Sequence, residues 1–336
     1  MITGLVLGKF MPFHKGHMAL IDYAKSNCDK LIIFLAADID EPIPYKHRLK
    51  WVLSTYLDDP QVEVFGDIID EPPILGDELS KWWGNYVTKR FGKIDRIFTS
   101  ESYGKAFAES ANAENWVFDK ARTIVPISGT MIRNRPLTHW HYLNNFAKDY
   151  FVKKIAIVGT ESTGKTTMCK QLADHYKTVW VPEAGRDLIP NSNDFSLEDL
   201  KIVGTEHAKN IIKYTRLSNK LLFIDTDLIM TKSYGKFFLN EVPKYEPWVE
   251  AANDIQYYIY LDVNAPYVND GTRLPKEKRD LLDKQHREFF EKAMFAGINI
   301  KSFPFYDNPA YIKGKEPYDF RLQGVIEYID YLISKF

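Results

Sequence analysis

Residues 154–167 read KIAIVGTESTGKTT, an apolar run that ends in a glycine-rich turn. The eight residues 159–166 match the phosphate-loop pattern GxxxxGK[ST] at every fixed position. This pattern needs a strand before it and a helix after it, and residues 154–158 and 167–176 have the corresponding character. A chance glycine turn rarely meets all three conditions. The sequence therefore predicts a parallel α/β domain that binds a nucleoside triphosphate.

The chemistry expected of this loop follows from its residues. Glycines let backbone N–H groups turn toward phosphate oxygens, and the N-terminus of the helix adds its positive dipole. Lys165 is expected to reach the β- and γ-phosphates, and the Thr166 hydroxyl to bind Mg²⁺. The predicted ATP-binding residues of the loop are Gly159, Glu161, Ser162, Thr163, Gly164, Lys165, Thr166 and Thr167.

An acidic pair follows another apolar run, LLFIDTD at residues 221–227. A strand of this kind delivers a carboxylate to Mg²⁺ or to the hydroxyl that accepts the phosphoryl group, so Asp225 and Asp227 are catalytic candidates, and Asp225 is also a candidate metal and substrate ligand. The alternative is that one of them caps the helix expected at 228–238, which is a reasonable role for one and not for both. The sequence leaves open which acid has which role.

Arginines near residue 273 suggest a segment that closes over ATP. The run DGTR at residues 270–273 follows the strand predicted at 256–262. An arginine closing over ATP stabilises charge on the transferred phosphoryl group and excludes water, and we expect Arg273 to do so. The charged segment 276–292 is interpreted as a solvated helix.

Strand and helix patterns alternate along the whole chain, and the alternation restarts near residue 150. At 336 residues the chain is long enough for two domains. The predicted strands are residues 2–7, 30–36, 62–65, 96–99, 116–118, 154–158, 178–181, 220–225, 256–262 and 298–303. Helical patterns lie between the first of these, at 18–25, 45–56 and 80–91. This order predicts parallel sheets covered by helices, with ligands at the carboxyl ends of the strands.

Composition limits the partners of the chain. Its 44 basic and 45 acidic residues nearly cancel, which argues against nucleic acid or an anionic membrane as the main partner. The two cysteines form no disulfide framework, and no run of 18 apolar residues or basic leader is present. We therefore expect a cytoplasmic protein that acts on small molecules. The tyrosine-rich run 257–260 suits either a core strand or an interface, so homo-oligomerisation stays open.

A second motif, GKFMPFHKGH at residues 8–17, follows the first predicted strand. His14 and His17 are three residues apart at the start of a helix, so both rings lie on one face near its positive end, which suits phosphate. A metal-binding pair is the first alternative, but no HExxH glutamate or nearby third ligand is present. Ordinary core or capping histidines are the second, although they do not require the preceding turn.

This motif resembles the (H/T)xGH signature of the nucleotidylyltransferase superfamily, and ISGTMIR at residues 127–133 is similar to its second motif, ISxTxxR. The resemblance implies attack on the α-phosphorus of a nucleotide with loss of pyrophosphate and no covalent enzyme intermediate. It makes His14, His17 and Arg133 catalytic candidates. The ATP-binding residues that it implies are Gly8, Lys9, Phe10, Ser128, Thr130 and Arg133. Lys46 and Arg48 are either further phosphate ligands or part of a solvated helix start.

Taken together, the motifs resemble the NadR family, with PEAGR at residues 182–186 adding to the likeness. The resemblance implies a Rossmann-like nucleotidylyltransferase domain over residues 1–147, then a P-loop kinase domain with a parallel sheet over residues 152–336. It implies that the second domain phosphorylates nicotinamide riboside and that the first adenylylates the resulting mononucleotide to NAD. Each step consumes one ATP, with Mg²⁺ as the cofactor.

The same resemblance suggests how the substrates are held. Glu183 and Arg186 lie where such kinases bind their acceptor. The nicotinamide ring needs an aromatic platform, for which Trp82 and Trp83 are candidates, although tryptophans more often belong to a core. Some family members begin with a DNA-binding helix-turn-helix, which is not expected here because the first catalytic strand starts at Ile2.

Two rival functions remain. The same two reactions can act on another nucleoside and another phosphate ester, because neither motif contacts the base. Alternatively, the chain is a nucleotide-sensing regulator in which one site is inactive.

Overall fold

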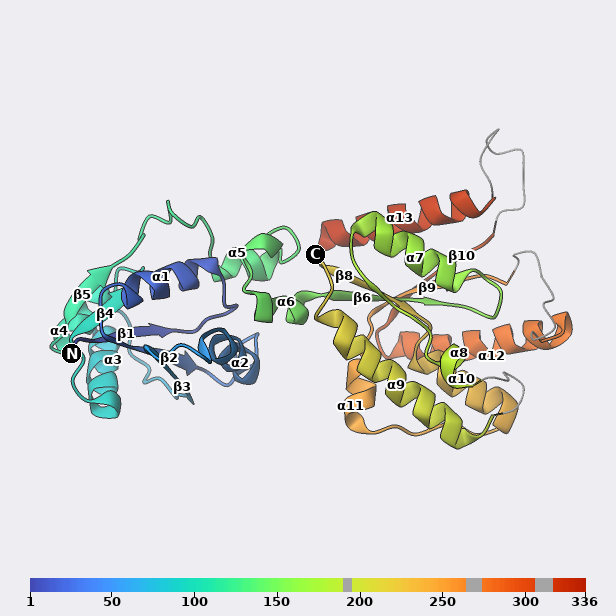
Figure 1. Cartoon of the computed structure of the whole chain (residues 1–336), viewed down its shortest axis with the longest axis horizontal. Helices are drawn as coiled ribbons and strands as arrows, with labels where there is room; N and C mark the ends of the chain where they lie inside the picture. Colours follow the sequence, from blue (N-terminus) through green and yellow to red (C-terminus); the bar gives the residue numbers. More distant parts are fainter. Residues whose placement is uncertain (190–194, 264–273, 306–316) are drawn as a thin grey trace. The chain divides into compact units, whose positions relative to one another are not determined.

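The computed structural model describes residues 1–189, 195–263, 274–305 and 317–336. The chain divides into two compact units, Met1–Phe151 and Val152–Lys335, each built on its own parallel sheet (Figure 1). Arg273, the arginine expected to close over ATP, lies outside the described residues.

The first unit has a five-stranded parallel sheet in the order β3-β2-β1-β4-β5. Its strands are β1 Thr3–Gly8, β2 Lys30–Ala37, β3 Val62–Ile68, β4 Arg96–Thr99 and β5 Glu114–Val117. The chain first runs outward from β1 to β3 and then crosses back to β4. The direction of winding therefore reverses between β1 and β4, and ligands of such sheets bind at this point, beyond the carboxyl ends of the strands.

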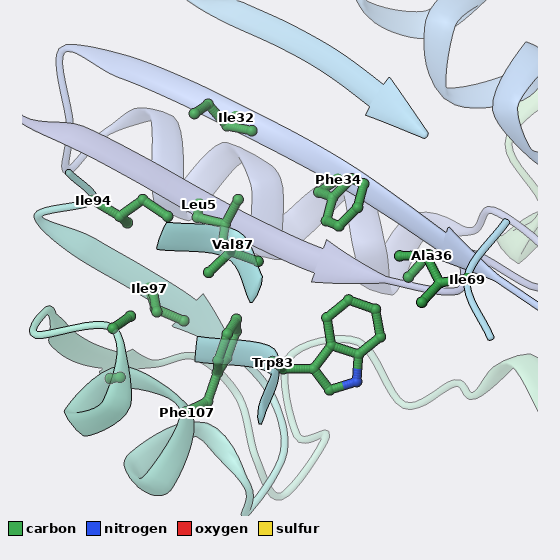
Figure 2. Close-up of a cluster of buried hydrophobic side chains, with 12 residues drawn as sticks. Leu5, Ile32, Phe34, Ala36, Ile69, Trp83, Val87, Ile94, Ile97 and Phe107 are labelled. Carbon is green, nitrogen blue, oxygen red and sulfur yellow. The ribbon is translucent and has the colours of Figure 1, made fainter. Parts of the chain in front are cut away.

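Helices cover both faces of this sheet. They are α1 Lys15–Lys25, α2 Tyr45–Tyr56, α3 Asp77–Phe91, α4 Gly104–Ser110, α5 Gly129–Asn134 and α6 Asn145–Phe151. Ile97 of β4 lies in the cluster that also holds Trp83 of α3 and Phe107 of α4 (Figure 2). The next residue, Phe98, packs edge-on against Tyr23 of α1, with 6.0 Å between ring centroids. Because neighbouring strand residues point to opposite faces, α1 and α3 lie on opposite sides of the sheet.

The second unit repeats this layered plan with the order β10-β9-β6-β8-β7. Its strands are β6 Lys153–Val158, β7 Trp180–Val181, β8 Leu221–Asp225, β9 Tyr257–Leu261 and β10 Asn299–Phe303. All of the paired strands run parallel. Tyr258 and Tyr260 of the tyrosine-rich run are buried inside β9, so core packing accounts for them.

The helices of this unit also form two layers (Figure 1). They are α7 Lys165–Tyr176, α8 Gly185–Leu188, α9 Leu197–Thr215, α10 Leu228–Leu239, α11 Pro247–Ala252, α12 Lys276–Phe295 and α13 Pro317–Lys335. α7 and α13 lie on one face, where the Tyr176 hydroxyl donates to Asp330 Oδ1 at 2.9 Å. α9, α10 and α12 lie on the other face.

The predicted α/β class with parallel sheets is confirmed, but one helix differs from its prediction. The charged segment 276–292 is the larger part of α12, and it is not simply solvated. Arg279, Asp283 and His286 on this helix are buried together with two apolar residues. The helix is confirmed, but the expectation that it is solvated was wrong, because buried polar residues whose partners lie on other elements leave no apolar periodicity in the sequence. Among the described helices, none has both the length and the apolar character that a membrane span needs.

Close packing between α3 and α4 gives a test of the first unit. A Cβ atom on Gly84 would lie 2.6 Å from the Phe107 carbonyl oxygen and 2.7 Å from Ser110 Cβ. We expect Gly84→Ala to lower the free energy of unfolding by about 1–3 kcal/mol, because the two helices must move apart. Gly324→Ala in α13 is the matched control, since its nearest neighbour would lie at 3.8 Å, and we expect it to be neutral or stabilising. Calorimetric melting in which Gly84→Ala matches the wild type would contradict this packing.

Candidate active sites

The two motifs of the first unit meet at a single cavity. This cavity has a volume of about 340 Å³ and adjoins the carboxyl end of β1. It lies at the reversal between β1 and β4, where the topology predicts a ligand. The sequence-predicted residues that line it together are Lys9, Phe10, His14, His17, Ser128, Thr130 and Arg133. Residues more than 110 positions apart in the chain thus form one site.

His14 caps a helix and also lines this cavity. Its Nδ1 accepts from the backbone N–H groups of Gly16 (3.1 Å) and His17 (3.4 Å) at the start of α1. An Nδ1 atom that accepts hydrogen bonds carries no proton, so the neutral ring carries its proton on Nε2. The capping interpretation is therefore correct for His14, and it fixes the tautomer that a phosphate-donating ring needs.

Both histidine rings are held in the neutral form. Burial, followed by the positive charge of Arg122, lowers the pKa of His14 to about 4. Burial also lowers the pKa of His17, with His14 and Arg122 as smaller causes. The two rings stack with 3.8 Å between their centroids. Among the described residues, no group of three or more His, Cys, Asp or Glu side chains is arranged to hold a metal ion.

The second motif contributes Ser128, Thr130 and Arg133 to the lining of the same cavity. Ser128 begins α5, and its Oγ accepts from the Met131 N–H at 3.2 Å. Arg133 donates to Thr130 Oγ1 at 3.0 Å and to the carbonyl oxygen of Met11. Because Met11 belongs to the first motif, Arg133 joins the two motifs directly.

Sequence reasoning missed Arg122, which also lines this cavity. It makes an ion pair with Glu101 at 2.9 Å. Its loop is held by the carboxylate of Asp119, which accepts from the N–H groups of Thr123, Ile124 and Val125. A single arginine in an irregular loop has no spacing that would have identified it.

A second, larger cavity of about 560 Å³ shares Lys9 and Glu101 with the first. Trp83 lines this cavity, although its side chain is only 7% exposed and belongs to the core cluster of Figure 2. Trp82 is not among the lining residues and stacks on Tyr86 with 5.2 Å between centroids. Of the two predicted tryptophans, the geometry therefore favours Trp83 as a ligand contact.

Arg48 is neither a phosphate ligand at these cavities nor part of a solvated helix start, the two roles expected from the sequence. Its side chain is fully buried, pairs with Glu41 at 2.6 Å and donates to the Lys9 carbonyl oxygen at 3.0 Å. It therefore supports the backbone of the first motif and lines neither cavity. Lys46, in the first turn of α2, is exposed and also lies away from both cavities.

In the second unit, the phosphate loop closes on itself around one carbonyl oxygen. Thr160 O accepts from Lys165 Nζ at 3.2 Å and from Thr163 Oγ1 at 2.8 Å. Gly159 has φ 137°, and a Cβ atom there would lie 2.5 Å from the Leu261 carbonyl oxygen. Only glycine fits this close approach. The remaining predicted loop residues, Glu161, Ser162, Gly164 and Thr167, lie in the same turn and in the start of α7.

Predicted residues from three segments converge beside this loop. The Thr166 hydroxyl donates to Asp225 Oδ2 at 2.5 Å, and Arg186 Nη2 lies 3.1 Å from Thr166 Oγ1 and 3.2 Å from Glu183 Oε2. Asp225 is fully buried, and its Oδ1 finds no hydrogen-bond partner among the described residues. Burial raises the pKa of this carboxyl group, which Lys165 opposes. A hydroxyl next to a buried carboxylate with a free oxygen atom is a donor set that fits Mg²⁺.

The geometry separates the two acids of FIDTD. Asp227 caps α10 by accepting from the Met230 N–H at 3.0 Å, and it also accepts from the Tyr258 hydroxyl at 3.0 Å. Burial raises the pKa of Asp227 to about 6. Both of its oxygen atoms are used inside the core, which argues against the predicted catalytic role. Within the described part of the chain, Asp225 is therefore the one of the two acids with an oxygen atom that is free to bind a metal ion or a substrate.

Comparisons with known proteins agree with this architecture. Residues 5–135 match the cytidylyltransferase-like family, and residues 154–303 match an AAA domain family. A NadR protein solved in complex with NR has the same fold, with a TM-score of 0.76 and 17% identity over 97% of this chain and 95% of that one. The nicotinamide-nucleotide adenylyltransferase of Thermococcus onnurineus is 25% identical over 159 residues, 45% of this chain and 82% of that protein.

The trifunctional NAD biosynthesis/regulator protein NadR of Escherichia coli is 32% identical over 301 residues. The match covers 80% of this chain and 71% of that protein. Its extent includes residues of both units, each of which carries its own nucleotide motif. The chain therefore belongs to the NadR family.

Proposed function

We propose that the chain is a bifunctional NAD-salvage enzyme. Its second unit phosphorylates nicotinamide riboside with ATP, and its first unit joins the resulting mononucleotide to the adenylyl group of a second ATP. The observation that carries this proposal is that each unit brings its own motif together: Lys9, His14, His17 and Arg133 line one cavity in the first unit, and Thr166, Arg186 and Asp225 converge beside the phosphate loop in the second. Membership of the NadR family supports the choice of substrates.

In the first unit, a phosphate oxygen of the mononucleotide attacks the α-phosphorus of ATP. The bond from the α-phosphorus to the oxygen that bridges it to the β-phosphorus breaks, and pyrophosphate leaves with the electron pair. The attacking phosphate is already ionised, so no general base is needed. Neutral His14 and His17 donate hydrogen bonds to the reacting phosphates, while Arg122 and Arg133 balance the charge that builds on pyrophosphate.

The cavity beside Trp83 is the proposed mononucleotide site. It adjoins the ATP cavity through Lys9 and Glu101. We therefore place the phosphate of the mononucleotide on the shared side, toward the cavity that His14 and His17 line. The Trp83 ring offers an apolar wall for the nicotinamide.

In the second unit, the 5′-hydroxyl oxygen of the riboside attacks the γ-phosphorus of ATP. The bond from the γ-phosphorus to the oxygen that bridges it to the β-phosphorus breaks, ADP leaves with the electron pair, and the hydroxyl proton is released to solvent. Lys165 neutralises the transferred phosphoryl group, and Glu183 and Arg186 hold the riboside. Thr166 and Asp225 would hold Mg²⁺, which when bound offsets the negative charge of the phosphates.

Two substitutions test whether the sites are independent. We expect Lys165→Ala to lower riboside phosphorylation by at least about 10²-fold, because the charge on the transferred phosphoryl group loses its cation. The same variant should adenylylate supplied mononucleotide at the wild-type rate. His17→Ala should lower adenylylation of the mononucleotide and leave riboside phosphorylation at the wild-type rate. Separate assays of the two products measure both rates, and loss of both activities in a folded variant would refute independent sites.

The protonation state of His14 can be measured directly. Because its pKa is lowered to about 4 in the folded protein, we expect its ring resonance to show no titration between pH 8 and pH 5.5 by NMR. The unfolded chain binds this proton near pH 6.5. Protonation of His14 in the unfolded chain alone lowers the free energy of unfolding. The folded protein therefore keeps its full stability above pH 6.5 and loses part of it as the pH falls toward 4. His14→Gln assigns the resonance, and a titration midpoint near 6.5 would contradict the neutral-donor role.

The two acids of the FIDTD strand should respond differently to truncation. Asp227→Ala removes a helix cap, so we expect unfolding to become easier by about 0.5–2 kcal/mol. Asp225→Ala should instead lower riboside phosphorylation by about 10²-fold or more, with a smaller loss of stability. Calorimetry and the kinase assay on both variants measure the difference. A catalytic loss confined to Asp227→Ala would reverse the assignment.

A further inference from the structure

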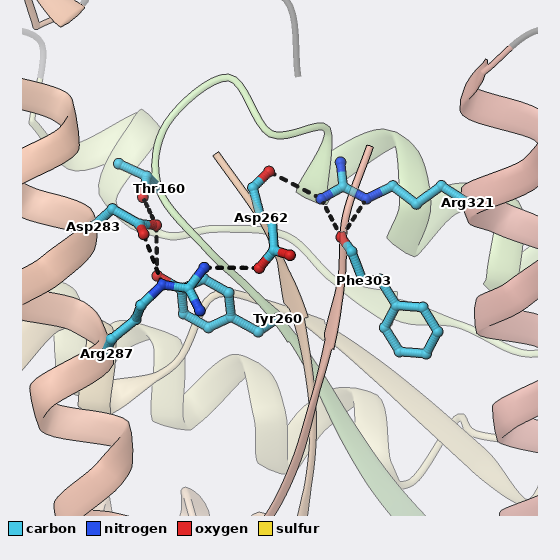
Figure 3. A network of polar contacts seen from close by, with 7 residues as sticks. All are labelled: Thr160, Tyr260, Asp262, Asp283, Arg287, Phe303 and Arg321. Carbon is cyan, nitrogen blue, oxygen red and sulfur yellow. Dashed lines mark hydrogen bonds and ion pairs between the residues drawn. The ribbon is translucent and has the colours of Figure 1, made fainter. Parts of the chain in front are cut away.

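A buried carboxylate on α12 contacts the phosphate loop from behind. Asp283 is 6% exposed, and its Oδ1 accepts from Thr160 Oγ1 at 2.6 Å and from the Tyr260 hydroxyl at 2.8 Å. Its Oδ2 accepts from Arg287 Nε at 2.8 Å. Figure 3 shows these groups gathered from the loop, β9 and α12 around one side chain. The loop is therefore anchored to a helix that lies 123 residues further along the chain.

Arg287 extends this network to the end of β9. Its Nη2 donates to Asp262 Oδ1 at 2.7 Å, and its guanidinium lies 4.4 Å from the centre of the Tyr260 ring. The two carboxylates and the stacked ring leave Arg287 little freedom to turn. Arg287 therefore fixes the orientation of Asp283.

The far side of the loop is held by α13. Arg321 is buried and donates to the carbonyl oxygen of Thr163 at 3.0 Å. It also donates to the carbonyl oxygens of Asp262 at 3.1 Å and Phe303 at 2.7 Å, as Figure 3 shows. These contacts secure main-chain atoms. Asp283, in contrast, accepts a hydrogen bond from the Thr160 side chain. The carbonyl oxygen of the same Thr160 accepts from the Lys165 ammonium group.

Asp283 is ionised in this environment. Burial opposes ionisation, but hydrogen bonds from Thr160, Arg287 and Tyr260 outweigh it and lower the pKa of the carboxyl group. Thr160 is fully buried, so its hydroxyl serves the network and does not contact a nucleotide. A buried ionic network of this kind adds little net stability compared with apolar packing. Its location behind the loop indicates that it serves the geometry of the loop.

We propose that Asp283 is a positioning residue for phosphoryl transfer: it fixes Thr160, and through the Thr160 carbonyl oxygen it places the ammonium group of Lys165. Arg287 in turn orients Asp283. The proposal rests on the proposed kinase function of the second unit. A displacement of about 1 Å in a catalytic group can cost about 10²-fold in rate, so a residue without substrate contact can control turnover.

The first test is Asp283→Asn in the full chain. Asparagine keeps the shape of the side chain but offers one acceptor oxygen to three donors. We expect kcat for riboside phosphorylation to fall by about 10- to 100-fold, with KM for the riboside changed by less than about threefold. Adenylylation by the first unit should be unchanged and measures the concentration of the chain in each assay, and calorimetric melting measures the fraction of folded protein. Asp280→Asn makes the same substitution at an exposed position of α12 and should leave both activities unchanged.

A second variant shows whether Asp283 acts through Thr160. Thr160→Val removes the donor hydroxyl and keeps the volume, and we expect a fall in kcat similar to that of Asp283→Asn. If both act on one geometry, the double variant should lose little more than the worse single variant, because their effects are not additive. Fully additive losses, or a wild-type kcat in Asp283→Asn, would overturn the proposal. A loss explained entirely by the fraction of unfolded protein would also overturn it.

Release of ADP in the absence of riboside tests the positioning role of Asp283 independently of whether nicotinamide riboside is the true acceptor. Phosphoryl transfer to water uses the same loop, and adenylyl transfer produces no ADP. If the wild type releases ADP but phosphorylates no riboside, the proposed acceptor is wrong. The ADP rate of Asp283→Asn then decides the positioning role: a 10- to 100-fold fall supports it, and an unchanged rate overturns it.

Discussion

Both units must hold cations and N–H groups in fixed positions against the negative charge of phosphates, and this constraint explains where their sites lie. In each unit the central strand of a parallel sheet turns directly into a helix, β1 into α1 and β6 into α7. Among the described residues, such a turn leaves backbone N–H groups at the positive end of α7 without a side-chain cap. At α1 the His14 ring accepts from the N–H groups of Gly16 and His17 and itself lines the cavity. The sheet makes the turn rigid, and the groups that meet phosphate are then positioned by contacts from behind.

Charged side chains next to the two sites hold the motif residues in place. Arg48 holds the backbone of Lys9 and is itself held by Glu41, and Asp283 holds Thr160 and is held by Arg287. In each pair, the residue that contacts the motif backbone or side chain, Arg48 or Asp283, is buried. The chain has 44 basic and 45 acidic residues, and this near balance is consistent with the pairing of Arg48 with Glu41 and of Arg287 with Asp283.

The sequence predicted the parallel α/β class and the motif residues, because backbone turns and phosphate chemistry demand particular residues at fixed spacing. It predicted that one of Asp225 and Asp227 caps the following helix but could not say which, because the Tyr258 hydroxyl that engages the second oxygen of Asp227 lies 31 residues away and meets it only in the fold. Arg122, Arg48 and Asp283 were missed or misjudged for the same reason. Their partners are distant in sequence or lie in irregular loops, and no periodic pattern marks such pairs.

The central claim is that two separate ATP-using sites act in series on one substrate. It is tested most directly by supplying the wild-type chain with isotopically labelled nicotinamide riboside, ATP and Mg²⁺, and by following the label, ADP and pyrophosphate over time. We predict that label passes through the mononucleotide into NAD, with one ADP and one pyrophosphate formed for each NAD. Label that stays in the riboside, or that stops at the mononucleotide while ATP is still present, would contradict the account.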